Sequence, residues 1–318
     1  MKTLLITRLV PQANIDFARR HFDVTLRESA IGLTEDEAAE ALKSYDAILP
    51  TLGDTFNAAA FEKAGGAIRC GVLANFGVGY NHIDAVAAKA VGVAVSNTPD
   101  TVTDATADIG MTLILATCRR AGEGERIVRA GQWKGWGPTA MLGTHVTGKK
   151  VGIVGMGRIG QAVAHRCHYG FGMPVYFYNR SLKPTKVPAL QVETLEELMG
   201  TVDIVVVTVP GGGANRHLID AKALAAMKPS GIFVNIARGD VVDEPALIAA
   251  LQAGTIKGAG LDVYEAEPFV PEALRVMENV VLLPHLGTAA LEVREAMGQM
   301  ALNNIMAWAE GKPLPQAV

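Results

Sequence analysis

The sequence is poor in cysteine, balanced in charge and free of long apolar runs. Its three cysteines, Cys70, Cys118 and Cys167, show no spacing typical of a disulfide framework or of a metal site. We therefore expect three simple buried thiols, no bound metal and a reduced compartment, the cytoplasm.

The charges exclude one class of partner. The chain carries 29 basic and 32 acidic residues, spread along its length, for a formal net charge of -3. Nucleic-acid binding needs lysine and arginine gathered against phosphates, so we expect no nucleic-acid partner.

The longest apolar run, around residues 204–209, has the length of a strand and falls short of the roughly 18 residues that cross a bilayer. We expect no membrane association, and we interpret MKTLLITRLV at the start as a first strand and not as a signal peptide.

The pattern of the chain predicts an α/β protein with two doubly wound domains. The 318 residues suit two domains, and 49% of them are hydrophobic while 19% are charged. Short β-rich runs alternate with helical patterns, which is typical of parallel sheets covered by helices on both faces. In the first hundred residues, Thr34 and Glu37 predict a capping box at a helix start. A second series of strands and helices begins at Lys150, after a glycine-rich stretch that contains Trp133 and Trp136.

A glycine motif predicts a dinucleotide site. In VGIVGMGRIGQAVA, Gly155, Gly157 and Gly160 have the G-x-G-x-x-G spacing between a β-run and a helical pattern. The first glycine permits a tight turn, the second lets the backbone approach a pyrophosphate, and the third lets helix and strand pack closely. The alternative is a glycine-rich loop that serves packing alone.

The residues after the next strand bear on the choice of cofactor. An NAD site usually carries Asp or Glu there, to bind the ribose hydroxyls, but this chain has Asn179, Arg180 and Ser181. A guanidinium can pair with a 2′-phosphate, so we expect NADP, as NADPH, with NAD a weaker cofactor. The alternative is a solvated loop in an NAD site.

Three polar residues follow predicted strands of the second series. Arg238 comes after GIFVNIA, Glu267 after GLDVYEA and His285 after VVLLP. Ligands bind outside the carboxyl ends of parallel strands, so these side chains can converge there. Histidine suits proton exchange, a carboxylate can hold its tautomer, and arginine matches a carboxylate substrate. Taken singly, each residue could instead be an ordinary strand-end or loop residue.

The order and spacing of six segments resemble the D-isomer-specific 2-hydroxyacid dehydrogenases, and within them the glyoxylate and hydroxypyruvate reductases. The segments are NFGVGYNHID at 75–84, TDATAD at 103–108, GIVGMGRIGQAVA at 152–164, NIARGDVVDE at 235–244, GAGLDVYEAEP at 258–268 and LLPHLGTA at 282–289. The resemblance implies that Arg238 binds the substrate's carboxylate and keto oxygen, that His285 is the acid/base and that Glu267 pairs with His285. It also implies that the amides of Val78 and Gly79 hold the substrate carboxylate. The residues expected at the cofactor are Thr106, Gly155, Gly157, Arg158, Ile159, Gly160, Asn179, Arg180, Ser181, Pro210, Ala237, Asp262 and Gly287.

The same resemblance implies the domain organisation. Residues 1–98 and 288–318 would form a flavodoxin-like outer, substrate-binding domain, and residues 99–287 would form the dinucleotide-binding domain, with substrate held in a cleft between them. An arm at about 106–149 would dock against a second copy to give a homodimer. Trp133 and Trp136 suit such an interface, and burial within their own chain is the alternative.

The implied activity is NADPH-dependent reduction of a small 2-keto acid, such as glyoxylate or hydroxypyruvate, to the D-2-hydroxy acid. One alternative on the same fold is oxidation of formate or phosphite, although formate dehydrogenases of this type place Gln where Glu267 stands. A second is a dinucleotide-sensing binding protein similar to the C-terminal binding protein corepressors, which keep the same Arg, Glu and His.

Overall fold

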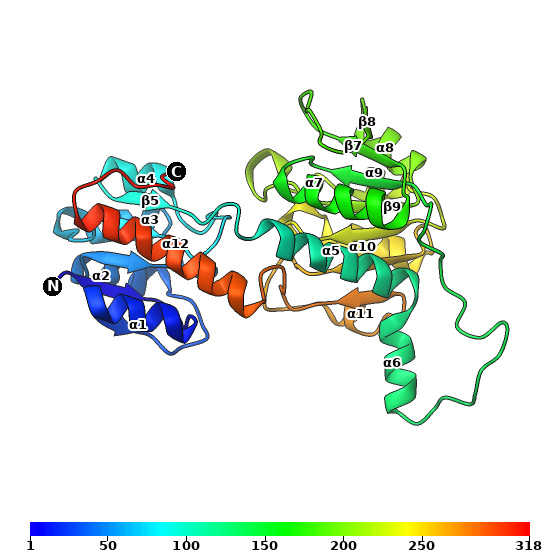
Figure 1. Cartoon of the computed structure of the whole chain (residues 1–318), viewed down its shortest axis with the longest axis horizontal. Coiled ribbons are helices and arrows are strands. Elements are labelled where there is room, and N and C mark those ends of the chain that lie inside the picture. The colour runs from blue at the N-terminus through cyan, green and yellow to red at the C-terminus, as the bar shows by residue number, and fades with distance from the viewer. The chain divides into compact units, whose positions relative to one another are not determined.

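The computed structural model describes residues 1–318, which divide into two compact units (Figure 1). Unit 1 consists of Met1–Val102 and Thr288–Val318, and unit 2 is Thr103–Gly287. Each unit has one parallel β-sheet between two layers of helices, so the α/β class predicted from the alternating pattern is confirmed.

Unit 1 has a five-stranded sheet in the order β2-β1-β3-β4-β5, which is the flavodoxin-like order. The apolar residues of α1 and α12 pack on one face of this sheet, and those of α2, α3 and α4 pack on the other. The strands are β1 Thr3–Ile6, β2 Asp23–Leu26, β3 Ala47–Leu49, β4 Val72–Ala74 and β5 Ala94–Ser96. The helices are α1 Gln12–His21, α2 Glu35–Ser44, α3 Ala58–Ala64, α4 Ala85–Ala90 and α12 Leu291–Ala309.

Unit 2 has a seven-stranded sheet in the order β12-β11-β10-β9-β6-β7-β8, in which the strand order reverses between β6 and β9. This is the dinucleotide-binding order with one more strand, and ligands bind where the order reverses. Helices α5 and α7 cover one face, and α8, α9 and α10 cover the other. The strands are β6 Val151–Val154, β7 Val175–Tyr178, β8 Ala189–Val192, β9 Ile204–Val207, β10 Ile232–Asn235, β11 Gly258–Leu261 and β12 Val280–Leu282. The helices are α5 Thr103–Cys118, α6 Ala121–Arg129, α7 Arg158–His165, α8 Leu195–Thr201, α9 Ala221–Ala225, α10 Glu244–Gln252 and α11 Glu272–Arg275.

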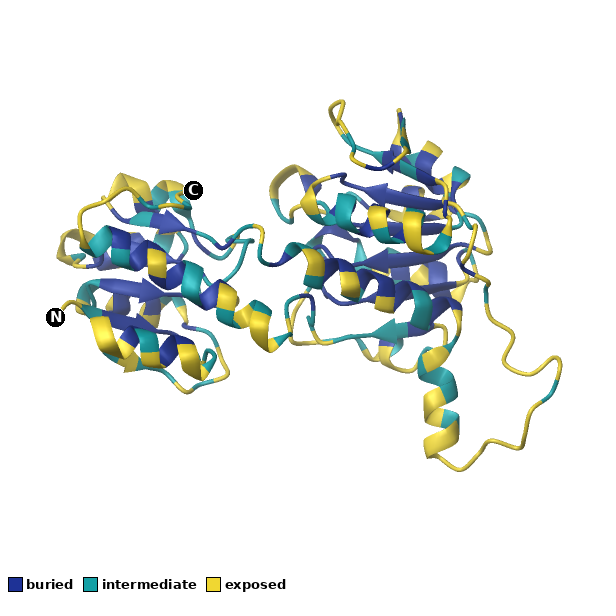
Figure 2. Cartoon of the chain, viewed as in Figure 1, coloured by how far each residue is buried: buried dark blue, intermediate teal, exposed yellow.

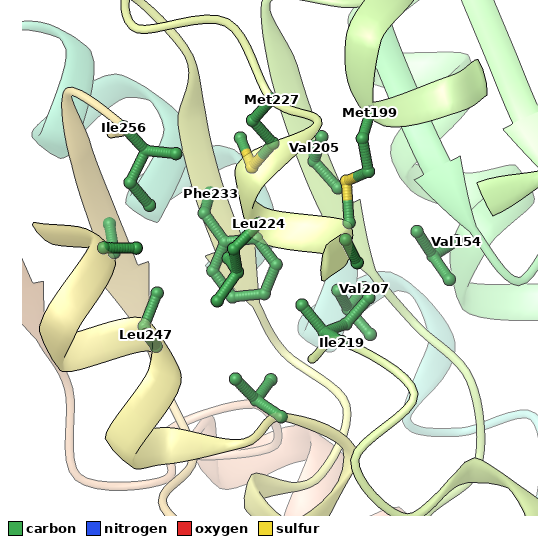
Figure 3. Packing of buried hydrophobic residues seen from close by; sticks show 14 of the residues in the cluster. Val154, Met199, Val205, Val207, Ile219, Leu224, Met227, Phe233, Leu247 and Ile256 are labelled. Carbon is green, nitrogen blue, oxygen red and sulfur yellow. The ribbon is translucent and has the colours of Figure 1, made fainter. Parts of the chain in front are cut away.

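The apolar runs of the sequence form the central strands. All of β9 and β10 is buried, and Val205, Val207 and Phe233 of these strands belong to one apolar cluster with Leu224 of α9 and Met227 of the turn after it (Figure 3). A strand covered by helices on both faces has no solvent side, which explains why IVVV shows no polar alternation.

Side-chain caps set the starts of several helices. The capping box predicted at Thr34 is confirmed, because its hydroxyl accepts from the Glu37 amide and the Glu37 carboxylate accepts from the Thr34 amide. Such caps satisfy amide groups that have no partner within the helix. At five other helix starts the N-cap side chain accepts from the amide three residues further on, without the reciprocal bond: Asn57, Asp84, Thr194, Asp220 and Asp243.

The sequence analysis missed strand β8 and the short helix α11. Strand β8 lies at the edge of its sheet, pairs with β7 alone and leaves Leu190 60% exposed. It follows a stretch with two prolines, Pro184 and Pro188, which is typical of a loop, so the pairing depends on β7 and not on local preference.

Residues 130–149, between α6 and β6, have no regular structure and are mostly exposed (Figure 2). Trp133 is 65% exposed and Trp136 is 85% exposed, so neither packs in the core of its own chain. Helix α5, by contrast, contributes Leu113 and Ile114 to the core of unit 2. The exposed part of the predicted arm is therefore α6 together with residues 130–149.

Cys70, Cys118 and Cys167 are unpaired and buried, as predicted. Burial raises the pKa of the Cys70 and Cys167 thiols to about 12 and that of Cys118 to about 11, so none is a reactive thiolate near neutral pH.

None of the helices combines the length and the apolar character that crossing a membrane requires.

Asp46, just before β3, is expected to make the stability of unit 1 depend on pH. Its carboxylate accepts from Arg69 Nε and Nη2 at 2.9 Å and from the Thr3 amide at 2.7 Å. The Arg69 hydrogen bonds lower the pKa of Asp46 from 3.8 to about 2, against the effect of burial. Stabilisation by Asp46 is therefore fully present above pH 3.8 and is lost as the pH falls through about 2.

We expect Asp46→Asn to reduce the free energy of unfolding by roughly 1 kcal/mol at pH 6. Urea denaturation between pH 6 and pH 2.5 should show the wild type and the variant converging as the pH falls. Glu62→Gln, at an exposed carboxylate without an ion pair, is the control. A difference that does not change with pH would contradict this account.

Candidate active site

The three polar residues predicted at strand ends follow neighbouring strands of unit 2. Strands β10, β11 and β12 are adjacent and parallel. Arg238, Glu267 and His285 come after these strands, so all three leave the sheet at its carboxyl edge. Their electrostatic interactions place Arg238 and His285 near the Glu267 carboxylate.

Glu267 and His285 form a hydrogen-bonded pair. His285 Nδ1 lies 2.8 Å from Glu267 Oε2, and the Tyr264 amide donates to Glu267 Oε1 at 3.0 Å. Burial alone would raise the pKa of Glu267, but the hydrogen bond from His285 and the charges of His285 and Arg238 hold it below its ordinary value. An ionised Glu267 accepts the Nδ1 proton of His285, so the proton that His285 can exchange is the one on Nε2.

Arg238 is half-buried beside this pair, and its Nη1 donates to the Ala237 carbonyl at 2.7 Å. Burial lowers the pKa of the guanidinium, while the carboxylates of Glu267 and Asp240 act in the opposite direction. A desolvated guanidinium gains from pairing with an anion, and its fork matches a carboxylate in particular.

Gly239 allows the loops after β10 and β11 to meet. A Cβ atom at Gly239 would lie 1.9 Å from the carbonyl carbon and oxygen of Tyr264. No other residue can accept so close an approach of two backbones. This contact brings the loop that carries Arg238 against the loop that carries Glu267.

Asp262 and Thr106 hold the loop that carries His285. The Asp262 carboxylate accepts from the Leu286 amide at 2.6 Å and from the Gly287 amide at 2.9 Å, and the Thr106 hydroxyl donates to the Gly287 carbonyl at 3.2 Å. The backbone of His285 has φ +54°, a conformation that residues other than glycine rarely adopt. Contacts with neighbouring residues must maintain it. The structure gives Asp262 and Thr106 this anchoring role, and their predicted contact with a cofactor stays a prediction.

The glycine turn has the geometry that a dinucleotide requires. Gly155 has φ +97°, and a Cβ at Gly160 would lie 2.3 Å from the Gly155 carbonyl oxygen, so both positions need glycine. A Cβ at Gly157 would meet nothing within 4 Å, which leaves room for a pyrophosphate. Helix α7, which contains Arg158 and Ile159, begins here without a side-chain cap, so its N-terminus is suited to phosphate. The residues present therefore fit a dinucleotide cofactor.

The remaining residues expected at the cofactor lie after β7, β9 and β10. Asn179 Oδ1 accepts from the Met156 amide at 2.9 Å, so its side chain joins the end of β7 to the glycine turn. Arg180 and Ser181 are exposed, and no carboxylate stands beside them in the sequence. Pro210 accepts from Asn215 Nδ2 through its carbonyl, and Ala237 is buried.

In unit 1, Val78 and Gly79 lie in the loop after β4, where two asparagines orient the backbone. Asn75 Nδ2 donates to the carbonyls of Gly77 at 2.9 Å and Gly79 at 3.0 Å, and Asn97 Nδ2 donates to the Val78 carbonyl at 2.8 Å. With the carbonyls bound, the Val78 and Gly79 amides make no hydrogen bond within the chain and are available to an anion. The sequence analysis missed Asn75 and Asn97, although each directly follows a buried strand.

No group of three or more His, Cys, Asp and Glu side chains in the chain is arranged to hold a metal ion.

Substitutions at two glycines should separate folding from dinucleotide binding. Gly160→Ala places a methyl group against the Gly155 carbonyl and should lower the free energy of unfolding by about 1–3 kcal/mol. Gly157→Ala meets no atom of the chain, so it should leave the melting temperature unchanged yet weaken dinucleotide binding about tenfold by occupying the space for the pyrophosphate. Calorimetric melting and titration with the cofactor measure the two effects. Unchanged affinity in Gly157→Ala would contradict the placement of the pyrophosphate.

The chain is similar to several known proteins. Residues 111–287 match the family model of the D-isomer specific 2-hydroxyacid dehydrogenase NAD binding domain. The chain is 42% identical to glyoxylate reductase of Thermococcus gammatolerans over 321 residues, with 99% of this chain and 95% of the relative covered. It is 43% identical to hydroxyphenylpyruvate reductase of Plectranthus scutellarioides, with 76% of each chain covered. The crystal structure of the NADPH-dependent glyoxylate/hydroxypyruvate reductase of Sinorhizobium meliloti with NADP and malonate matches with a TM-score of 0.88 and 33% identity, covering 100% of this chain and 96% of that one. The chain therefore belongs to the D-isomer-specific 2-hydroxyacid dehydrogenase family.

Proposed function

We propose that the protein is an NADPH-dependent reductase that converts a small 2-keto acid, glyoxylate or hydroxypyruvate, to the D-2-hydroxy acid. The observation that carries the proposal is the His285–Glu267 hydrogen bond of 2.8 Å beside the half-buried Arg238. Relatives named glyoxylate reductase, and the reductase of Sinorhizobium meliloti, support the substrate class.

Each residue of the site has a distinct role in the proposed reaction. Arg238 binds the substrate carboxylate and polarises the keto oxygen, because its desolvated guanidinium stabilises the negative charge that develops there. His285 donates its Nε2 proton to that oxygen, and Glu267 stabilises the imidazolium and keeps the ring oriented. The amides of Val78 and Gly79 bind the substrate carboxylate. The bound nicotinamide supplies the hydride.

The preference for NADPH rests on the end of β7. In NAD sites a carboxylate at this position binds the ribose hydroxyls and repels a 2′-phosphate. This chain has Arg180 and Ser181 there, which are exposed and can bind a phosphate. The Sinorhizobium meliloti relative, which is named NADPH-dependent and has NADP bound, supports the same choice.

We expect the purified chain to oxidise NADPH with glyoxylate and hydroxypyruvate at roughly 1 to 1000 turnovers per second, and NADH with a lower kcat/KM.

His285→Ala should lower kcat by about 10²- to 10⁴-fold, since the general acid is lost, while titration shows cofactor binding unchanged. His21→Ala, in an exposed position of α1, is the matched control. Absence of turnover with both cofactors, although both bind, would favour a dinucleotide-sensing binding protein.

We also propose that two copies of the chain pair through α6 and residues 130–149. This segment exposes large apolar side chains that no part of its own chain covers: Val128 at 61%, Trp133 at 65%, Trp136 at 85% and Leu142 at 64%. Aromatic side chains gathered on a surface are typical of the buried centre of an interface, and a second copy would remove them from water.

Sedimentation should therefore give twice the 33.5 kDa chain mass for the wild type. The double variant Trp136→Ser and Leu142→Ser should dissociate, because it removes apolar area from the interface. Leu182→Ser, at a residue that is 91% exposed outside this segment, should leave the mass of the wild type unchanged. A monomeric wild type, or a double variant that stays dimeric, would refute the pairing.

A further inference from the structure

One side chain holds most of the exposed loop after β7. Gln191 Nε2 donates to the carbonyls of Asn179 at 3.2 Å and Ser181 at 3.0 Å, and the Lys183 amide donates to Gln191 Oε1 at 3.2 Å. The amide of Gln191 thus uses both its donor and its acceptor groups on residues 179–183. The loop backbone at 180–183 makes no other hydrogen bond within the chain.

The position of Gln191 explains why it can do this. It lies in β8, paired with Phe177 of β7, and its half-buried side chain reaches past the end of β7 to the loop. Two fixed carbonyls, at 179 and 181, flank Arg180, so the backbone that bears its guanidinium has little freedom. Without these bonds the exposed loop would have to become ordered when a ligand binds, and that ordering would weaken binding.

We propose that Gln191 is a positioning residue for cofactor selectivity, which orients the loop so that Arg180 and Ser181 meet the 2′-phosphate of NADPH. This proposal rests on the proposed NADPH preference. Gln191 does not touch the phosphate in this account, because its amide is engaged by the loop backbone. It acts through Arg180 and Ser181, which the loop presents.

The test measures binding of two cofactor fragments, 2′,5′-ADP and 5′-AMP, by titration calorimetry. Gln191→Met keeps the length of the side chain but makes none of the three hydrogen bonds. We expect it to bind 2′,5′-ADP roughly five- to twentyfold more weakly than the wild type and 5′-AMP within about twofold of it. The ratio of kcat/KM for NADPH to that for NADH should fall by a similar factor. Gln299→Met, at a half-buried glutamine of α12 that donates to Asn303 Oδ1, is the matched control.

A double-mutant cycle with Arg180→Ala distinguishes positioning from a general effect on the fold. Arg180→Ala should weaken 2′,5′-ADP binding by itself, and adding Gln191→Met should then weaken it by a smaller factor than Gln191→Met does in the wild type, because part of its effect passes through Arg180. Fully additive losses would overturn the proposal, as would equal losses for both fragments. Equal affinity of the wild type for the two fragments would overturn the NADPH preference, and the role of Gln191 with it. A preference of the wild type that survives in Gln191→Met would overturn the role of Gln191 alone.

Discussion

The parallel alignment of β10, β11 and β12 is the constraint on which the candidate site depends. Parallel strands bring their carboxyl ends to one edge of a sheet. Arg238, Glu267 and His285 are far apart in the sequence, but they come after neighbouring strands and therefore lie at the same edge. The close backbone contact at Gly239 brings the first two loops together. The charges then depend on one another, since Glu267 is kept ionised by His285 and Arg238 although burial opposes this.

Hydrogen bonds between side chains and the backbone hold two loops of the candidate site, the one that carries His285 and the one that carries Val78 and Gly79. Asp262 binds the amides beside His285, and the side-chain amides of Asn75 and Asn97 bind the carbonyls beside Val78 and Gly79. Asp262 and Asn75 are buried and Asn97 is half-buried, and their hydrogen bonds compensate for the loss of contact with water. The placement of His285, Val78 and Gly79 on their loops therefore rests on a small number of anchors that lie directly after strands.

Much of this organisation could be predicted from the sequence, because it is encoded locally. The structure contains three features that the sequence predicts: a glycine turn at 155–160, a capping box at Thr34 and buried central strands at the apolar runs. Strand β8 was not predictable in this way, since an edge strand after two prolines owes its pairing to β7. The exposure of Trp136 was equally hard to predict, because the local sequence does not distinguish an exposed tryptophan from a buried one. The anchors Asn75 and Asn97 were missed because their partners are backbone atoms, which leave no motif.

The contacts of Asp262 determine which substitutions the loop that carries His285 can tolerate. Its carboxylate binds the amides of Leu286 and Gly287, and every residue except proline has an amide. The position of His285 therefore does not depend on which side chain residue 286 carries. Substitution of residue 286 by any residue except proline therefore changes the local side-chain surface, while both hydrogen bonds that hold the His285 loop can still form.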